Sequence, residues 1–276
     1  MTDDATDHEL RDLAERLARE AGAIALRGRR DAGDRLLGDT KSTATDLVTD
    51  FDRAAEAHIV GELRRLRPDD AIVGEEGTDD AGTSGIAWYL DPIDGTTNFV
   101  YDQVAWACSI GVSRDGEMVA GVVYVPPLDE LFGATSGHGA TRNGTTIHPS
   151  AETDLALALV GTGFSYRVGS RVRQAEVVAE LIGHVRDIRR LGSAAFDLCM
   201  VACGRLDVYY ERYLNPWDSA AGELIAREAG AIASDFTGSA PRPDELVVAA
   251  PGVHAAFLTA LEGAISGAIG RSPGDS

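Results

Sequence analysis

Two carboxylates, a glycine turn and two threonines lie together in the stretch Asp91-Pro92-Ile93-Asp94-Gly95-Thr96-Thr97-Asn98-Phe99. The apolar run Ile86–Leu90 precedes this stretch and predicts a buried strand that ends at the first carboxylate. Carboxylate oxygens suit Mg²⁺. Gly95 lets backbone N–H groups approach an anion closely, and a helix beginning near Thr96 would point its positive end at that anion. The stretch is therefore typical of a site for cations beside a phosphate, with an ordinary Asp-Gly turn as the alternative.

The composition excludes some partners and leaves others open. The 276 residues carry a formal net charge of −19, with 44 acidic and 25 basic residues. Nucleic acids and anionic membranes would not be attracted to such a surface, whereas a phosphorylated substrate is compatible with it because bound divalent cations reverse the local field. The sequence has no apolar run of the ~18 residues that a membrane span needs. Its acidic start lacks a signal region, and its three cysteines do not suggest a disulfide framework. We expect a cytoplasmic protein without membrane or nucleic-acid partners.

Lysine is almost absent, and nearly all basic residues are arginine. The acidic excess suggests a high-salt cytoplasm, where screening removes the self-repulsion of an acidic surface. If composition has replaced lysine elsewhere, Lys41 is the one position that needs a compact ammonium group. The alternative is chance survival of this single lysine.

Apolar periodicity divides the chain into an N-terminal α+β half, residues 1–150, and a C-terminal α/β half, residues 151–276. In the first half we expect helices at 7–27 and 50–67, a charged loop at 28–38 and a short hairpin at 41–49. We also expect single strands at 71–73, 86–90 and 131–134 and a longer hairpin at 108–125. In the second half strands and helices alternate, with strands at 155–161, 188–191, 206–211, near 232 and at 246–249, and helices at 170–182, 193–203, 218–229 and from about 253.

Further acids follow apolar strands or begin helices. Glu75 ends one predicted strand, and Asp218 begins a late helix directly after Trp217. Acids at strand C-termini and helix N-termini can meet in one crevice, where cations make the cluster tolerable because unpaired carboxylates would raise one another's pKa. The alternative for each acid is a solvated or helix-capping residue, and Asp218 in particular could be only an N-cap.

Three segments together resemble the signatures of the inositol monophosphatase family, which belongs to a superfamily with fructose-1,6-bisphosphatases and bisphosphate nucleotidases. They are Gly74-Glu75-Glu76, the stretch 91–99 and Trp217-Asp218-Ser219-Ala220-Ala221-Gly222. The resemblance covers roughly residues 10 to 260. It implies a five-layer α/β/α/β/α sandwich, an N-terminal half with an antiparallel sheet, frequent homodimers, and Mg²⁺-dependent phosphomonoester hydrolysis with lithium sensitivity in many members.

The resemblance also implies roles for individual residues. Glu75, Asp91 and the carbonyl of Ile93 would hold one Mg²⁺; Asp91, Asp94 and Asp218 would hold a second; a third, weaker ion would lie near Glu75. Gly95 and Thr96 would contact phosphate, and Thr96 and Glu75 would orient the attacking water. Lys41 and Asp52 resemble an outer active-site pair. Gly192, Ser193, Ala194 and Glu211 resemble the pocket for the alcohol.

The favoured function is therefore hydrolysis of inositol-1-phosphate by direct attack of metal-activated water. Alternatives with the same chemistry are a fructose-1,6-bisphosphatase or dual-activity sugar phosphatase, and then a phosphatase for histidinol phosphate or 3′-phosphoadenosine 5′-phosphate. A catalytically silent scaffold or RNA-associated regulator is the alternative from another class. Arg189 and Arg190 precede the Gly192 segment. They either meet a second phosphate or acidic group of the substrate, or pair with surface acids.

Overall fold

The computed structural model describes residues 6–33, 39–40 and 47–270. The helices in these ranges are α1 (Asp7–Ala32), α2 (Asp50–Leu66), α3 (Thr96–Val100), α4 (Val168–Leu181), α5 (Ala194–Ala202), α6 (Pro216–Ala229) and α7 (His254–Gly270). The strands are β1 (Asp39–Thr40), β2 (Leu47–Val48), β3 (Ala71–Gly74), β4 (Asp79–Asp80), β5 (Ile86–Asp94), β6 (Ala107–Arg114), β7 (Glu117–Val125), β8 (Glu130–Thr135), β9 (Ala140–Arg142), β10 (Thr145–Thr146), β11 (Leu159–Thr162), β12 (Asp187–Arg189), β13 (Val208–Arg212), β14 (Ile232–Ser234) and β15 (Glu245–Ala249).

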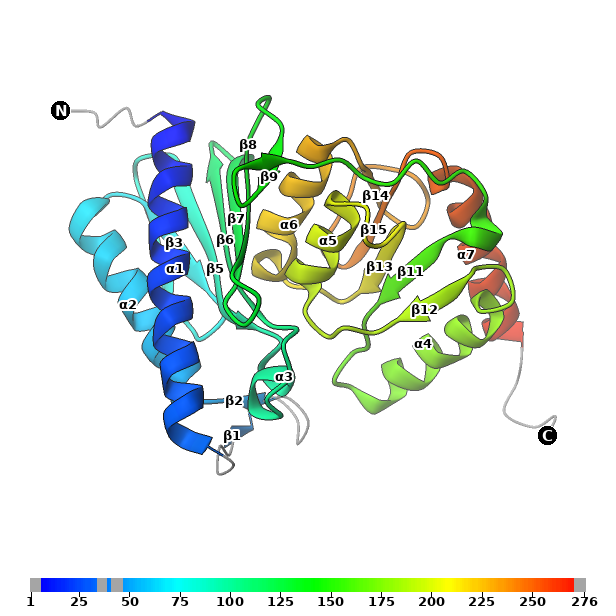
Figure 1. The fold of residues 1–276 in the computed structure, drawn as a ribbon, viewed down its shortest axis with the longest axis horizontal. Helices are drawn as coiled ribbons and strands as arrows, with labels where there is room; N and C mark the ends of the chain where they lie inside the picture. Colours follow the sequence, from blue (N-terminus) through cyan, green and yellow to red (C-terminus); the bar gives the residue numbers. More distant parts are fainter. Residues whose placement is uncertain (1–5, 34–38, 41–46, 271–276) are drawn as a thin grey trace.

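These elements stack in five layers (Figure 1). In order, the layers are α1 with α2, a large sheet, α5 with α6, a smaller sheet, and α4 with α7. Each sheet therefore has helices on both faces, as expected when its two faces are apolar. The predicted α/β/α/β/α sandwich is confirmed. The division near residue 150 into two folding units stays a prediction.

Helix α1 is longer than its predicted range. A capping box starts it: the Thr6 hydroxyl accepts from the Glu9 backbone N–H, and the Glu9 carboxylate accepts from the Thr6 N–H at 2.7 Å. The helix then continues to Ala32, so the loop predicted from residue 28 is wrong over its first residues. The buried Arg29 explains the difference, because its Nε donates to the carbonyl of Phe99 at 2.8 Å. This bond holds the last turns of the helix against the segment that contains Phe99.

The large sheet places the quoted stretch at the centre of the molecule. Among the described residues its strand order is β10-β9-β8-β7-β6-β5-β3-β4, and only β3 and β5 pair in parallel. Trp88 and Leu90 of β5 are fully buried in the cluster that includes α1 and α2. Strand β5 extends to Asp94, beyond the predicted residue 90, with a register shift against β6 between Asp91 and Asp94. This irregularity turns the end of the strand into the site described below.

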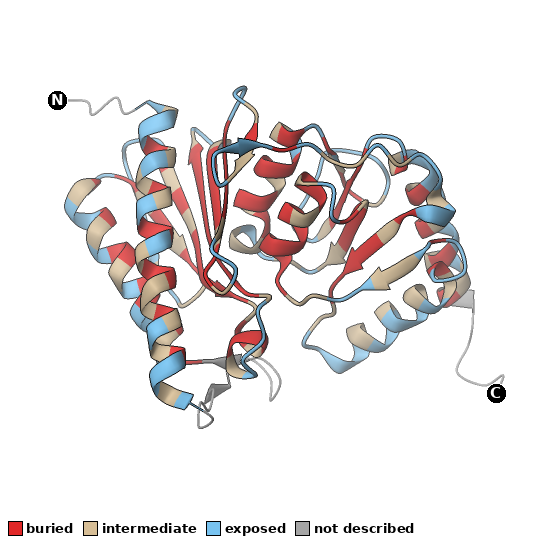
Figure 2. Ribbon diagram, in the orientation of Figure 1, coloured by how far each residue is buried: buried red, intermediate tan, exposed pale blue. Residues whose placement is uncertain are grey.

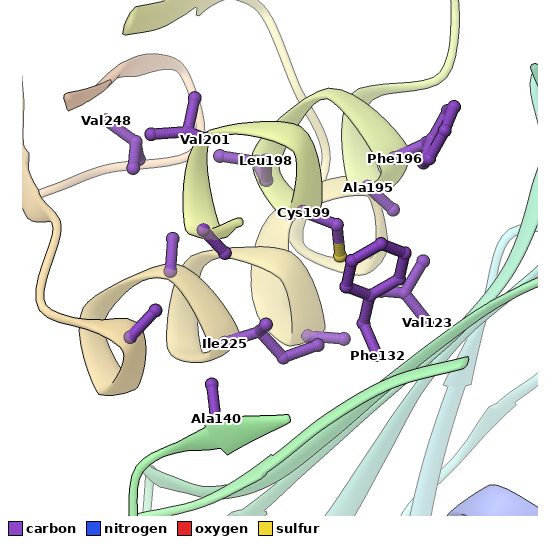
Figure 3. Packing of buried hydrophobic residues seen from close by; sticks show 14 of the residues in the cluster. Val123, Phe132, Ala140, Ala195, Phe196, Leu198, Cys199, Val201, Ile225 and Val248 are labelled. Carbon is purple, nitrogen blue, oxygen red and sulfur yellow. The ribbon is translucent and has the colours of Figure 1, made fainter. Parts of the chain in front are cut away.

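Helices α5 and α6 form an apolar layer between the two sheets. Figure 2 shows that both are largely buried, in contrast to the half-exposed α1 and α4. Figure 3 shows Leu198 and Cys199 of α5 beside Ile225 of α6, with Phe132 of the large sheet reaching toward them. A helix that is apolar on most sides has to be covered on most sides, so this layer fixes the spacing between the sheets and brings the N-terminal ends of both helices toward β5.

The smaller sheet has the order β12-β11-β13-β15-β14 in the described part of the chain. Strand β11 pairs in parallel with β12 and β13, while β15 is antiparallel to β13 and β14. The strand predicted from residue 155 begins only at Leu159, because Leu155–Leu157 forms a 3₁₀ turn that Asp154 caps at the Ala156 N–H (3.0 Å). None of the helices within the described ranges is both long enough and apolar enough to span a bilayer.

Candidate active site

A pocket of about 690 Å³ opens at the C-terminal end of β5. It collects predicted site residues from both halves of the chain: Glu75, Asp91, Ile93, Asp94, Gly95, Thr96, Gly192, Ser193, Ala194, Glu211 and Asp218. Asp52 lies behind the pocket wall rather than in it. Lys41 lies outside the described residues. The structure thus brings together the acids that the sequence places far apart, and their roles stay predictions.

Asp94 joins the two halves. Its Oδ2 accepts hydrogen bonds from the Ser193 hydroxyl and from the backbone N–H of Ala195, both at 2.7 Å. Ser193 is the N-cap of α5, so the carboxylate lies at the positive end of that helix. Burial raises the pKa of Asp94 to about 6, although these hydrogen bonds oppose the change and the charge of Glu75 adds to it.

The turn after Asp94 depends on Gly95. This residue has a φ of +96°, in the left-handed region, where it precedes α3. A Cβ there would lie 3.0 Å from the carbonyl oxygen of Ala105 and 3.1 Å from that of Gly192. The crowded position has no room for a larger residue, so the backbone of the quoted stretch packs directly against the Gly192 segment of the second half.

Asp52 and Thr96 form a hydrogen-bonded unit behind the pocket. The Thr96 hydroxyl lies 3.1 Å from Oδ1 of Asp52 and 3.2 Å from the Ile93 carbonyl oxygen, and can donate to either. Asp52 is fully buried, and its other oxygen accepts from the backbone N–H of Thr49 at 2.8 Å in the capping box of α2. The first turn of α2 therefore fixes the orientation of the Thr96 hydroxyl. Asp52 supports this hydroxyl and does not line the pocket.

Glu56 is a supporting residue that sequence reasoning missed. It is buried on α2, and its carboxylate accepts from the Glu76 backbone N–H at 2.8 Å and from the Thr78 hydroxyl at 2.7 Å. These bonds hold the turn that follows β3, while the backbone N–H of Glu75 donates to the Leu90 carbonyl at 3.0 Å. Glu56 therefore fixes the segment that carries Glu75. An acid directly beside the apolar face of a helix was the available signal.

Asp218 takes part in helix capping, although it is not the N-cap that the sequence offered, because Asn215 is the N-cap of α6. Asp218 is the N3 residue of α6, and its Oδ2 accepts from the backbone N–H of Asn215 at 2.7 Å, which is a capping interaction. The same carboxylate lines the pocket. Burial and the charge of Asp94 raise its pKa well above the ordinary value, which a solvated cap would not show.

The carboxylates repel one another across this space. Burial raises the pKa of Asp91 well above the ordinary value, and the charges of Glu75, Asp94 and Asp218 add to the effect. Within the described residues no three of the acids converge as a ready-made metal cluster; they surround a shared space instead. An all-oxygen donor set with unrelieved negative charge fits a hard divalent cation such as Mg²⁺, which would offset that repulsion.

The pocket contains two further acids, Glu211 and Asp197. Glu211 accepts a short hydrogen bond from the Tyr209 hydroxyl, and burial raises the pKa of Glu211 to about 7. Asp197 of α5 also lines the pocket and was not predicted. It is 1% exposed, its Oδ1 has no hydrogen-bond partner, and burial followed by the charge of Glu211 raises its pKa well above the ordinary value. A single aspartate in the apolar segment Ala194–Ala202 was the only sequence signal.

The fold and this acid-lined pocket are those of a phosphoric monoester hydrolase. A model of the inositol monophosphatase family matches residues 6–269. The chain therefore belongs to the inositol monophosphatase family, and the family resemblance seen in the sequence is confirmed.

Individual relatives agree with this assignment. Inositol-1-monophosphatase SuhB of Mycobacterium tuberculosis H37Rv is 45% identical over 274 residues, which cover 92% of this chain and 93% of the relative. Nus factor SuhB of Escherichia coli K12 is 38% identical over 268 residues, covering 96% of this chain and all of the relative. A staphylococcal inositol monophosphatase, solved with inositol monophosphate bound, superposes with a TM-score of 0.78 at 31% identity, covering 94% of this chain and 96% of that one.

Proposed function

We propose that this protein hydrolyses phosphomonoesters of polyols with Mg²⁺, with inositol-1-phosphate as the main substrate. The observation that carries the proposal is the meeting of Glu75, Asp91, Asp94 and Asp218 around one pocket beside Gly95 and Thr96. Similarity to an inositol-1-monophosphatase and to a structure that binds inositol monophosphate supports this choice of substrate.

The acids of the pocket would hold the cations. Glu75, Asp91 and the Ile93 carbonyl would bind one Mg²⁺, and Asp91, Asp94 and Asp218 a second, with a third and weaker ion near Glu75. When bound, such ions lower the pKa of water and neutralise charge on phosphate oxygens. The protein itself supplies fixed positions for these ions, because Asp94 and Asp218 are each held by backbone N–H donors.

The remaining residues would orient the reactants. With its proton directed at Asp52 or at the Ile93 carbonyl, Thr96 turns an oxygen lone pair toward the pocket, where it can accept a hydrogen bond from the attacking water. Glu75 would accept the second hydrogen of that water. The backbone at Gly95 and Thr96 would bind phosphate, while Ser193, Ala194 and Glu211 would face the alcohol. We expect direct attack by water with inversion at phosphorus and no phosphorylated enzyme.

The test is release of phosphate from inositol-1-phosphate with Mg²⁺ and with the chelator EDTA, using Asp91→Asn as the inactive control. Strong release that needs Mg²⁺ and is lost in the variant supports the proposal. Release that chelation does not affect, or a trapped phospho-aspartate, contradicts the mechanism.

A regulator without catalysis is the second candidate, because one relative is named a Nus factor. Two features disfavour it here: the chain has every predicted acid of the pocket, and its net charge of −19 would repel RNA. Absence of any phosphate release across a panel of phosphomonoesters would favour it.

A further inference from the structure

The structure separates the neighbouring arginines Arg189 and Arg190. Arg189, at the end of β12, pairs with Asp187 at 2.6 Å on the surface and does not line the pocket. Arg190 lines the active pocket. Its guanidinium passes over Gly192, where a Cβ would lie 2.2 Å from Nη1. The missing side chain at Gly192, which also has a φ of +94°, therefore gives Arg190 its place at the pocket.

Arg190 is exposed and makes no ion pair within the described residues. Two acids of the pocket, Glu211 and Asp197, are near it, and neither forms an ion pair with it. Burial raises the pKa of Glu211 and of Asp197, and the charge of Arg190 only partly offsets this. Because no carboxylate of the described chain holds this guanidinium, its hydrogen-bond donors are available to a ligand in the pocket.

Arg167 adds a second guanidinium of the same kind. It lies directly before α4, is exposed, lines the same pocket and likewise has no ion pair in the part of the chain that the structure describes. Two guanidinium groups without an ion pair among the described residues therefore lie at one pocket, where their hydrogen-bond donors can face the same ligand.

The second half of the chain brings both signs of charge to the pocket. Glu75, Asp91 and Asp94 belong to the first half, whereas Arg167 and Arg190 belong to the second, as do the acids Asp197, Glu211 and Asp218. Within the described residues, the pocket therefore has its arginines on the second half only, beside three of its acids. Its volume of about 690 Å³ lies within the ~300–1,000 Å³ range of small-molecule sites.

We propose that Arg190, assisted by Arg167, binds the second anionic group of those substrates that carry one, in addition to inositol-1-phosphate, at the part of the pocket formed by the second half of the chain. This inference rests on the proposed function and extends it. The ligands are sugar or polyol phosphates that carry another phosphate or a carboxylate away from the scissile ester. A guanidinium suits both groups because its planar fork donates two parallel hydrogen bonds to their oxygens.

The experiment compares two substrates with the same scissile ester, fructose 1,6-bisphosphate and fructose 1-phosphate, which differ only in the second phosphate. The readout is the ratio of their kcat/KM values with Mg²⁺. We expect wild type to favour the bisphosphate, and Arg190→Gln to lower the ratio about 10- to 100-fold, as for loss of a charge-assisted hydrogen bond. Arg167→Gln should lower it about 3- to 10-fold. Arg189→Gln is the matched control and should leave both rates unchanged. Melting temperatures check that each variant folds.

A ratio that Arg190→Gln leaves unchanged would overturn the inference, because Arg190 would then act on the part that both substrates share. A wild-type preference for fructose 1-phosphate would overturn it as well. Inositol-1-phosphate is measured in the same series to separate the two proposals. If wild type cleaves inositol-1-phosphate but the ratio of the two kcat/KM values does not behave as expected, only the inference about Arg190 is rejected. If Mg²⁺ supports cleavage of none of the three substrates, the proposed function falls and the inference with it.

Discussion

Replacing Asp94 by asparagine should stabilise the metal-free protein while abolishing catalysis. The carboxylate is buried among other acids, and its pKa is about 6 in the folded protein against an ordinary value of 3.8. The folded state therefore holds a proton that the unfolded state releases. Below pH 3.8 both states are protonated and nothing is lost. As the pH rises from 3.8 through 6 the folded protein loses stability, and above 6 the loss is complete.

The size of this effect follows from the two pKa values. The interval between 3.8 and about 6, at ~1.4 kcal/mol for each pH unit, gives about 3 kcal/mol. An asparagine carbonyl can still accept from the Ser193 hydroxyl and the Ala195 N–H, so the change removes mainly the charge. We expect Asp94→Asn to raise the melting temperature by about 5 °C at pH 8 in EDTA. The gain should become small near pH 4.

The assay is thermal unfolding of both proteins in EDTA at pH 4, 6 and 8, repeated with excess Mg²⁺. Mg²⁺ should raise the melting temperature of wild type strongly at pH 8, because the ion replaces the proton as the partner of the carboxylates. It should raise that of Asp94→Asn much less. A variant that is less stable than wild type at pH 8 in EDTA, or a gain that does not depend on pH, would refute the electrostatic reasoning.

Four further predictions concern activity and salt. Asp91→Asn should lower turnover of inositol-1-phosphate by about a thousandfold or more, since it removes a proposed shared cation ligand, while its melting temperature in EDTA should be no lower than that of wild type; normal turnover with normal metal binding would contradict the site. Asp52→Asn should lower kcat about tenfold with little change in KM, because it loosens the hold on Thr96; an equal rise in KM would indicate a substrate contact instead. Lys41→Arg should reduce activity more than the surface change Arg27→Lys does. Equal rates in the two variants would favour the alternative that Lys41 has no specific role and is present by chance. Activity and melting temperature should both rise with KCl if the acidic surface reflects a high-salt cytoplasm; full activity in dilute buffer would exclude this.

The elements that sequence predicts well are those that local chemistry determines. The periodicity of α2 and its stop before Pro68, the hairpin at Asp115-Gly116 and the Gly230 cap of α6 are all confirmed within a few residues. The corner between Asp91 and Gly95 is equally local, because a strand, two acids and a glycine follow one another directly. The longer reach of α1 could not be predicted, since it depends on the bond from Arg29 to a carbonyl 70 residues away.

The residues that sequence missed act through distant neighbours. Glu56 looks like one more helical acid until the turn after β3 folds against it and offers two backbone N–H donors. Asp197 lies in a helix whose other residues are apolar, and only the arrangement of α5 between two sheets brings it to the pocket. Arg190 differs from Arg189 by one position, and the backbone turn at Gly192 decides which of them meets the pocket. The local signals for Glu56 and Asp197 show that these acids are unusual, but they do not show which distant residues the acids meet.

Capping interactions at the N-termini of three helices lie at or beside the pocket. Asp52 and Asp218 each complete a capping box, in α2 and α6, and the N-cap of α5, Ser193, donates to Asp94. Three helices from two layers thus begin at the site. Their N-terminal N–H groups are positive and would otherwise lack partners. A buried cluster of carboxylates and a bound phosphate both need such donors, so the end of β5 can tolerate negative charge that an ordinary strand end could not. The capping residues for this reason support the site, although Asp52 does not line the pocket, and substituting them should change the proposed affinity for Mg²⁺ as well as stability.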